Sequence, residues 1–446
     1  MEKTIEDPVA GQLINRRDFL WITSMTAAGF IAGCATNPVT GKSQLMLVSK
    51  ETELQIDQQY SPHQTSTDYG ILQDKGLNNY ISRTGMKIAA NTHRKDMPYN
   101  FKGVNATYVN AYAFPGGSIA ATRGILLSLD NEAELAALLG HELGHVNARH
   151  TAERMSKGMV IQTVVGGLAV LAGTQSSGLG ELAGTLGMVG AGALLASYSR
   201  DNERQADELG MEYMVRAGYD PKGMIGLMDM LNSLSKHSPN AIELMFSTHP
   251  MSSERYKTAV DRVETNYKNR NKNLLFRERY KDYTAGLRAQ KRVIENIQKG
   301  EEEIAGKKYE SAENYFKNAL GEAPGDYAGL LMMAKCQLMQ ESYNEARQYA
   351  EKAKSVYPQE AQANYICGFA KIKQKKFESA YEDFVNYEEK LPGNPNTTFF
   401  KGYSQEGMQN TKAAADQYYK YLQVVKEGEN AQHAYKRLVE WGYVKD

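Results

Sequence analysis

Apolar residues in the middle of the chain recur at the three- and four-residue steps of an α-helix. Asn131 stands three positions before Glu134, which is the spacing of a capping box at a helix start. The pattern therefore predicts a helix with one apolar face that begins beside Asn131. Its apolar stripe consists of Leu135, Leu138, Leu139, Leu143 and Val146.

Just before this helix, the pattern changes to one that favours strands. Residues 108–114 alternate and are rich in aromatic side chains, and the run is ended by Pro115-Gly116-Gly117. A second short run follows over residues 118–122. We expect a strand, a turn and a second strand that lead into the helix.

A period of 34 residues organises the carboxy-terminal third of the chain. Small residues precede each marker alanine, and a proline closes each of the first three units. This is the pattern of tetratricopeptide repeats, in which paired helices touch at small residues. It predicts about four repeats over residues 300–440, joined to the preceding part by a charged linking helix over residues 271–299. The marker alanines are Ala312, Ala346, Ala380 and Ala414.

The segment 159–196 is apolar and dense in glycine. Each of its halves is about 14 residues long, which is too short to span a bilayer. Two interpretations stay open. The segment is either a helical hairpin packed between two helices, or a mobile lid or surface that touches membrane or substrate.

The amino terminus has the order of signals found in exported bacterial lipoproteins. An apolar run that ends in Ile-Ala-Gly-Cys34 follows the pair Arg16-Arg17. We expect a twin-arginine-type lipoprotein signal peptide over residues 1–33, cleaved so that Cys34 becomes the lipidated first residue. Residue 35 is alanine rather than aspartate. By resemblance to bacterial lipoprotein sorting, this favours a lipid anchor in the periplasmic leaflet of the outer membrane.

Composition narrows the classes of partner. The 52 basic residues balance 52 acidic ones, which argues against nucleic acid or a strongly acidic partner. The 446 residues suggest two or three domains. Besides Cys34, only Cys336 and Cys367 remain, and either a disulfide or two buried thiols would fit a periplasmic protein.

The predicted helix contains a metal-binding motif. Residues 141–145 read His-Glu-Leu-Gly-His. Two histidines four residues apart lie on one face of a helix, so His141 and His145 are predicted to bind one Zn²⁺. Glu142, next to the first histidine, is placed to activate the attacking water of a metallopeptidase.

A catalytic zinc site needs a third protein ligand, and the best candidate is a carboxylate on a second helix. We expect Asp201 to cap that helix and Glu203 to bind the metal. Asp207, one turn further, is expected to orient a ligand histidine. His150 lies five residues beyond His145 and would point about 140° away from the ligand face if the helix continued.

Taken together, these motifs resemble the gluzincin metallopeptidases of the HtpX and CAAX-prenyl-protease type. The resemblance covers about residues 36–265 and includes the segments 37–49, 110–117 and 247–250. It implies an α+β zincin-like, mainly helical peptidase domain over residues 34–270, followed by an all-α tetratricopeptide repeat solenoid.

The same resemblance assigns a role to the first predicted strand. It implies an edge strand beside the metal, to which a substrate backbone can add as a further strand. A buried hairpin without a substrate role is the competing interpretation. The candidate substrate-binding residues are Asn110, Ala111, Tyr112, Ala113 and Phe114.

His249 precedes Pro250 on a segment expected to be irregular, so it can approach the metal from outside the two helices. It is a candidate catalytic residue that stabilises the oxyanion, or a removable fourth zinc ligand. An inert loop histidine is the remaining interpretation. Arg255 is a second, weaker candidate for the oxyanion role.

Two functional classes follow. The first is a periplasmic, membrane-anchored zinc endopeptidase for the quality control or assembly of envelope proteins. Its repeats would dock misfolded or stalled substrates or the outer-membrane assembly machinery. The second is a tetratricopeptide chaperone or assembly adaptor with a latent zinc site. The complete set of Glu142, Glu203 and Asp207 favours the first, because a pure scaffold has no need of Glu142.

Overall fold

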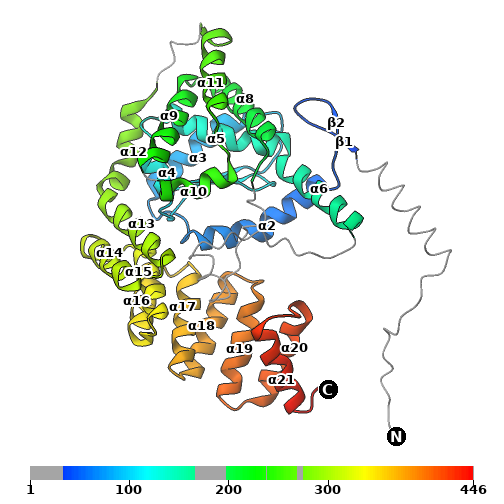
Figure 1. The fold of residues 1–446 in the computed structure, drawn as a ribbon, viewed down its shortest axis with the longest axis vertical. Helices are drawn as coiled ribbons and strands as arrows, with labels where there is room; N and C mark the ends of the chain where they lie inside the picture. The colour runs from blue at the N-terminus through cyan, green and yellow to red at the C-terminus, as the bar shows by residue number, and fades with distance from the viewer. Residues whose placement is uncertain (1–33, 166–196, 238, 269–274, 445–446) are drawn as a thin grey trace, which may run out of the picture.

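A computed structural model describes residues 34–165, 197–237, 239–268 and 275–444 of the chain. A mainly helical body with a small sheet is followed by successive antiparallel helix pairs (Figure 1). The expected fold class is therefore confirmed. The predicted signal peptide and residues 166–196 of the glycine-rich segment lie outside the described residues.

The first part contains two small sheets and the helices around them. Its elements are β1 (Cys34–Thr36), β2 (Ser43–Leu45), α2 (Lys50–Thr67), α3 (Lys75–Ala89), β3 (Asn100–Val104), β4 (Ala111–Ala113), β5 (Ser118–Thr122), α4 (Arg123–Ser128), α5 (Glu132–Ala148), α6 (His150–Val165), α8 (Arg200–Arg216), α9 (Lys222–His237), α10 (Pro239–Thr248) and α11 (Ser253–Thr265).

The second part is entirely helical. Its elements are α12 (Arg277–Ala289), α13 (Lys291–Ala305), α14 (Tyr309–Glu322), α15 (Tyr327–Met339), α16 (Tyr343–Val356), α17 (Gln362–Lys373), α18 (Phe377–Lys390), α19 (Pro395–Gly407), α20 (Thr411–Val424) and α21 (Glu429–Glu440). Among the described residues, none of the helices combines the length and the apolar character that crossing a bilayer requires.

The larger sheet has the order β3-β5-β4, with β3 parallel and β4 antiparallel to β5. The predicted strand, turn and strand are confirmed, and β4 is an edge strand. Alternation along β4 sends side chains to opposite faces. Ala111 and Ala113 join the core around α5, whereas Tyr112 and Phe114 pack with Tyr60 of α2 on the other face.

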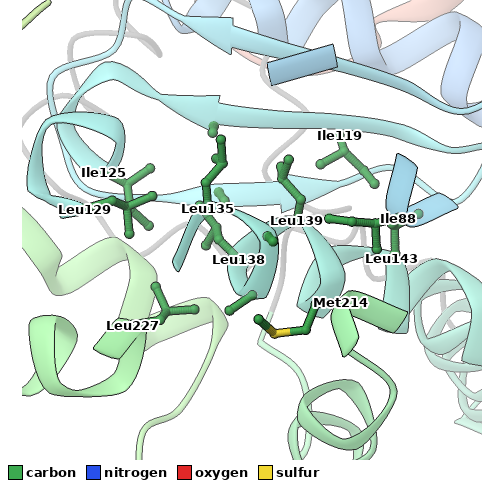
Figure 2. Packing of buried hydrophobic residues seen from close by; sticks show 14 of the residues in the cluster. Ile88, Ile119, Ile125, Leu129, Leu135, Leu138, Leu139, Leu143, Met214 and Leu227 are labelled. Carbon is green, nitrogen blue, oxygen red and sulfur yellow. The ribbon is translucent and has the colours of Figure 1, made fainter. Parts of the chain in front are cut away.

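Helix α5 is the centre of the core, and it is buried along its whole length. Figure 2 shows its leucines packed against Ile119 of β5, Ile88 of α3, Met214 of α8 and Leu227 of α9. The predicted helix start is confirmed, because the Asn131 side chain accepts a hydrogen bond from the backbone N–H of Glu134 at 3.0 Å. Burial from every side explains why the helix cannot shift relative to its neighbours.

Glycines let α5 and α8 approach backbone to backbone. A Cβ atom on Gly144 would lie 2.8 Å from the carbonyl oxygen of Ala206. One on Gly140 would lie 2.8 Å from the carbonyl oxygen of Gly210. Side chains at these positions would force the two helices apart. The close approach brings the amino-terminal half of α8 directly over the two histidines of α5.

The charged stretch expected to form one linking helix contains two. Helix α12 ends at Ala289, and α13 begins at Lys291 after a break at Gln290. Because of this break, the two helices pack against different parts of the molecule. Arg288 of α12 donates to the carbonyl oxygen of Leu129 at 2.7 Å, whereas α13 packs on α14 as the first helix of the first repeat.

The repeats are built as their period predicts. All marker alanines are buried in the second helix of a pair. A Cβ atom on Gly368 would lie 2.9 Å from the Phe384 ring, which explains why a small residue is needed there. Cys336 and Cys367 are both buried free thiols, so the disulfide alternative is not realised.

The carboxy-terminal end of α2 connects the two parts of the molecule, and Figure 1 shows α2 between them. The Ser66 hydroxyl, in the last turn of α2, donates to the buried carboxylate of Glu360 in the repeats. The Tyr69 hydroxyl, just past the end of α2, donates to the buried carboxylate of Glu301 at 3.0 Å. Arg123 forms a bidentate pair with Asp326, at 2.6 and 3.2 Å. Part of the repeat array therefore holds the peptidase-like body itself.

Candidate metal centre

Four buried side chains bring their donor atoms together beside α5. The Nε2 atoms of His141 and His145 lie 3.0 Å apart, and His249 Nδ1 lies 3.3 Å from His141 Nε2. Glu203 Oε1 is 3.1 Å from His249 Nδ1 and 3.3 Å from His145 Nε2. All four donors lie within 4.8 Å of one another.

This spacing suits a small tetrahedral ion. Bonds of about 2.0–2.2 Å in tetrahedral geometry separate neighbouring ligand atoms by roughly 3.3 Å. The imidazole and carboxylate donors are of the types that such ions prefer. Among the described residues, this is the one cluster of metal-ligating side chains with such spacing.

Local helix geometry positions three of the donors. His141 and His145 are one turn apart on α5, and Glu203 stands in the first turn of α8. The expected cap of α8 is wrong. Ser199 is the cap residue and forms a capping box with Asn202, whereas Asp201 lies inside the first turn and pairs with Arg204. Serine satisfies the orphan backbone donors at this start, so the helix begins earlier than expected.

The side chains behind the donors hold them in place. Asp207 Oδ1 lies 2.9 Å from His141 Nδ1, the arrangement that orients a ligand histidine. Arg255 of α11 donates to both oxygens of Asp207 at 2.7 Å and pairs with Glu203 at 2.7 Å. The Arg255 guanidinium thus binds the two carboxylates whose charge it neutralises.

Glu142 is fully buried beside this cluster. Neither of its carboxylate oxygens has a hydrogen-bond partner among the described residues, and its Oε1 lies 3.9 Å from His249 Nε2. A buried, unpaired carboxylate is costly unless something at the site uses it. Burial raises the pKa of Glu142, which suits a group that must accept a proton and release it again.

His249 enters the cluster from outside the two helices. It follows α10 directly, and its backbone N–H donates to the carbonyl oxygen of Met245 at 2.7 Å. Tyr198 stacks on His145 with ring centroids 3.8 Å apart, and its ring centroid lies 5.4 Å from that of His249.

His150 lies at a position that helix periodicity does not predict. Helix α5 ends at Ala148, and Arg149 takes a left-handed conformation with φ of 60°. The chain therefore turns, and His150 Nδ1 comes 2.9 Å from His145 Nδ1 instead of pointing away. It is not among the four donors. Nothing in the local sequence period signals the turn, because Arg149 is neither glycine nor asparagine.

The edge strand lies beside the cluster. A narrow pocket beside it is lined in part by Ala113, Phe114, His145 and Tyr198. Asn110 and Ala111 precede these residues and are buried. Tyr112 points to the opposite face, where its hydroxyl donates to the buried carboxylate of Asp68.

The sequence around this site matches a known peptidase family. The model of peptidase family M48 matches residues 76–263, and a tetratricopeptide repeat model matches residues 303–368. The beta-barrel assembly-enhancing protease of Yersinia pestis is 31% identical over 198 residues, which cover 43% of this chain and 40% of that protein. Its counterpart from Escherichia coli K12 is 28% identical over 242 residues, covering 53% and 49%.

A third relative is the metalloprotease YcaL of Escherichia coli K12. It is 32% identical over 167 residues, which cover 37% of this chain and 63% of YcaL. The matches to the first two relatives span at most about half of their length. The four donors lie inside the matched region, and the helix pairs follow it. This chain carries a peptidase family M48 domain followed by tetratricopeptide repeats.

Proposed function

We propose that this protein is a zinc-dependent endopeptidase in which His141, His145 and Glu203 hold the metal. The observation that supports it best is the joint placement of these donors and the unpaired, buried carboxylate of Glu142. A site that only bound metal for structure would be complete without Glu142. A hydrolytic site needs a base at this position.

Zinc, when bound, would polarise the scissile carbonyl and lower the pKa of water. Glu142 then accepts the proton of the attacking water and passes it to the leaving amine. Asp207 accepts a hydrogen bond from Nδ1 of His141, so that Nε2 keeps its lone pair for the metal. Arg255 offsets the negative charge of Glu203 and Asp207, which would otherwise be costly in a buried site.

The edge strand β4 is the proposed docking site for the substrate backbone. An extended peptide can pair with the free edge of a sheet, because the edge presents unpaired backbone N–H and C=O groups. Asn110 through Phe114 lie at the β4 edge of the sheet and are buried, and Ala113 and Phe114 line a narrow pocket together with His145. The strand therefore can direct a peptide bond towards Glu142.

The physiological role is proposed from the sequence signals and the names of the relatives. Envelope proteins that are misfolded or stalled during assembly are the proposed substrates. The repeats would dock them or the outer-membrane assembly machinery. Because Glu360 already binds Ser66 of α2 and Glu301 binds Tyr69, this docking would use other surfaces of the array.

Zinc removal tests the proposed activity. Casein cleavage by the purified chain should stop after chelation and return when one equivalent of Zn²⁺ per chain is restored, because the attacking water cannot be activated without the ion. A parallel preparation of Glu142→Gln identifies cleavage by a contaminating protease. Undiminished cleavage by protein that elemental analysis shows to be metal-free would refute the proposal.

The proposed anchor is tested separately. Cys34→Ser should leave an uncleaved precursor or a soluble periplasmic form, because serine cannot receive the thioether-linked lipid. Fractionation after salt and carbonate washing measures this. Cys336→Ala is the matched control, since that thiol is buried in the repeats, and it should stay with the membrane. Full retention of Cys34→Ser in the membrane fraction would contradict the lipid anchor and would implicate segment 159–196 in membrane binding.

A further inference from the structure

Each ligand histidine of α5 has a hydrogen-bond partner at its second ring nitrogen. For His141 the partner is Asp207. For His145 the partner is His150, whose Nδ1 lies 2.9 Å from Nδ1 of His145. His150 Nε2 in turn lies 2.9 Å from the side-chain carbonyl oxygen of Gln205 on α8. Both imidazoles are buried.

These contacts allow one arrangement of protons in a pair of neutral rings. The carbonyl oxygen of Gln205 can only accept, so the proton of His150 resides on Nε2. Nδ1 of His150 then carries a lone pair and accepts from Nδ1–H of His145. Nε2 of His145 is left with its lone pair, and it faces the other three donors.

We propose that His150 and Gln205 form a relay that sets the tautomer and ring orientation of His145 for metal binding. Both are positioning residues that act through His145. The inference rests on the proposed zinc site and adds to it. It adds a third residue of α8 to the site, because this helix supplies Glu203, Asp207 and Gln205.

The turn that delivers His150 is itself fixed. Arg149, the left-handed residue, pairs with Glu53 of α2 at 3.0 Å and donates to the carbonyl oxygen of Val48 at 2.7 Å. Arg94 holds the other oxygen of Glu53 at 2.6 Å. A left-handed conformation is unfavourable for arginine and persists only where the surroundings over-determine it. Here buried ion pairs hold the turn, and with it the His150 ring.

Zinc affinity measured by chelator competition tests the relay. His150→Leu should bind zinc about 10–100-fold more weakly than wild type, the usual effect of losing such a partner. His150→Asn should stay within a few-fold of wild type, because its side-chain oxygen can replace Nδ1 as the acceptor. Gln205→Leu should weaken binding, and Gln205→Glu, which keeps an acceptor, should not.

Further measurements separate positioning from folding. The visible spectrum of Co²⁺-substituted protein should change in His150→Leu but not in His150→Asn, because the spectrum reports ligand geometry. His63→Leu is the matched control, since His63 is a buried histidine of α2 outside the donor cluster, and its zinc affinity should equal that of wild type. If His150→Leu does not fold, the comparison of Gln205→Leu with Gln205→Glu still tests the relay.

Two results would overturn the relay. One is zinc affinity in His150→Leu or Gln205→Leu that equals wild type. The other is an equal loss in His150→Leu and His150→Asn, which would show that packing rather than hydrogen bonding matters. Wild-type protein that binds no zinc would instead refute the proposed function, so the two failures are distinguishable.

Discussion

Glu142→Gln should retain zinc and lose proteolysis by at least about 10²-fold, the lower end of what general-base catalysis contributes. Glutamine has nearly the shape of glutamate, but its amide cannot accept the proton of the attacking water. The four donor atoms belong to other residues, so metal content should stay near that of wild type. Cleavage of casein and elemental analysis of the same preparation measure both quantities.

The control for this variant is Glu153→Gln. Glu153 lies on α6, where it forms a surface pair with Lys157 at 2.7 Å, and it does not belong to the donor cluster. Its removal should leave cleavage within about twofold of wild type, as expected for a surface pair. If Glu142→Gln cleaved casein as fast as wild type, Glu142 would not be the base.

His249→Ala should raise basal proteolysis, on the order of tenfold, with zinc retained by the other three donors. The reason is the position of Nδ1, which lies 3.3 Å from His141 Nε2 and 3.1 Å from Glu203 Oε1. That is the spacing of a fourth ligand, and a catalytic zinc needs this coordination site for water and the substrate carbonyl. An enzyme held mostly in the closed state gains activity in proportion to the released fraction.

The sign of the change distinguishes the two roles considered for His249. If His249 donated a hydrogen bond to the oxyanion, its removal would lower turnover by about 10²-fold or more. His249→Cys is the informative companion, because a thiolate can also occupy the fourth position and should keep the enzyme idle. Steady-state cleavage of an unstructured substrate measures all three proteins. Unchanged activity in His249→Ala would reject both roles.

Predictions that depend on one helix or one repeat agree well with the structure. The spacing of His141 and His145 implies a shared face because both lie on one uninterrupted helix. The repeats were predictable for the same reason. Each 34-residue unit packs mainly on its neighbours, so the period in the sequence is the period in space.

Other features depended on contacts that no local pattern carries. The glycines of α5 and α8 are ordinary in sequence, but Gly140 and Gly144 decide how closely the helices approach. The cap of α8 was misassigned to Asp201 because several residues there can cap a helix, and the structure uses Ser199. The hydrogen bonds from Ser66 to Glu360 and from Tyr69 to Glu301 join residues that are more than 200 positions apart.

Short-range periodicity predicts the paired histidines of α5, the paired carboxylates of α8 and the repeat architecture, because each of these sets lies within one helix or one repeat. Long-range packing brings His249 to the other donors and places His150 between His145 and Gln205. His249 lies past the end of a helix, and His150 lies past a left-handed turn at Arg149. Beyond such points helical periodicity no longer applies, and long-range packing alone sets the direction of a side chain.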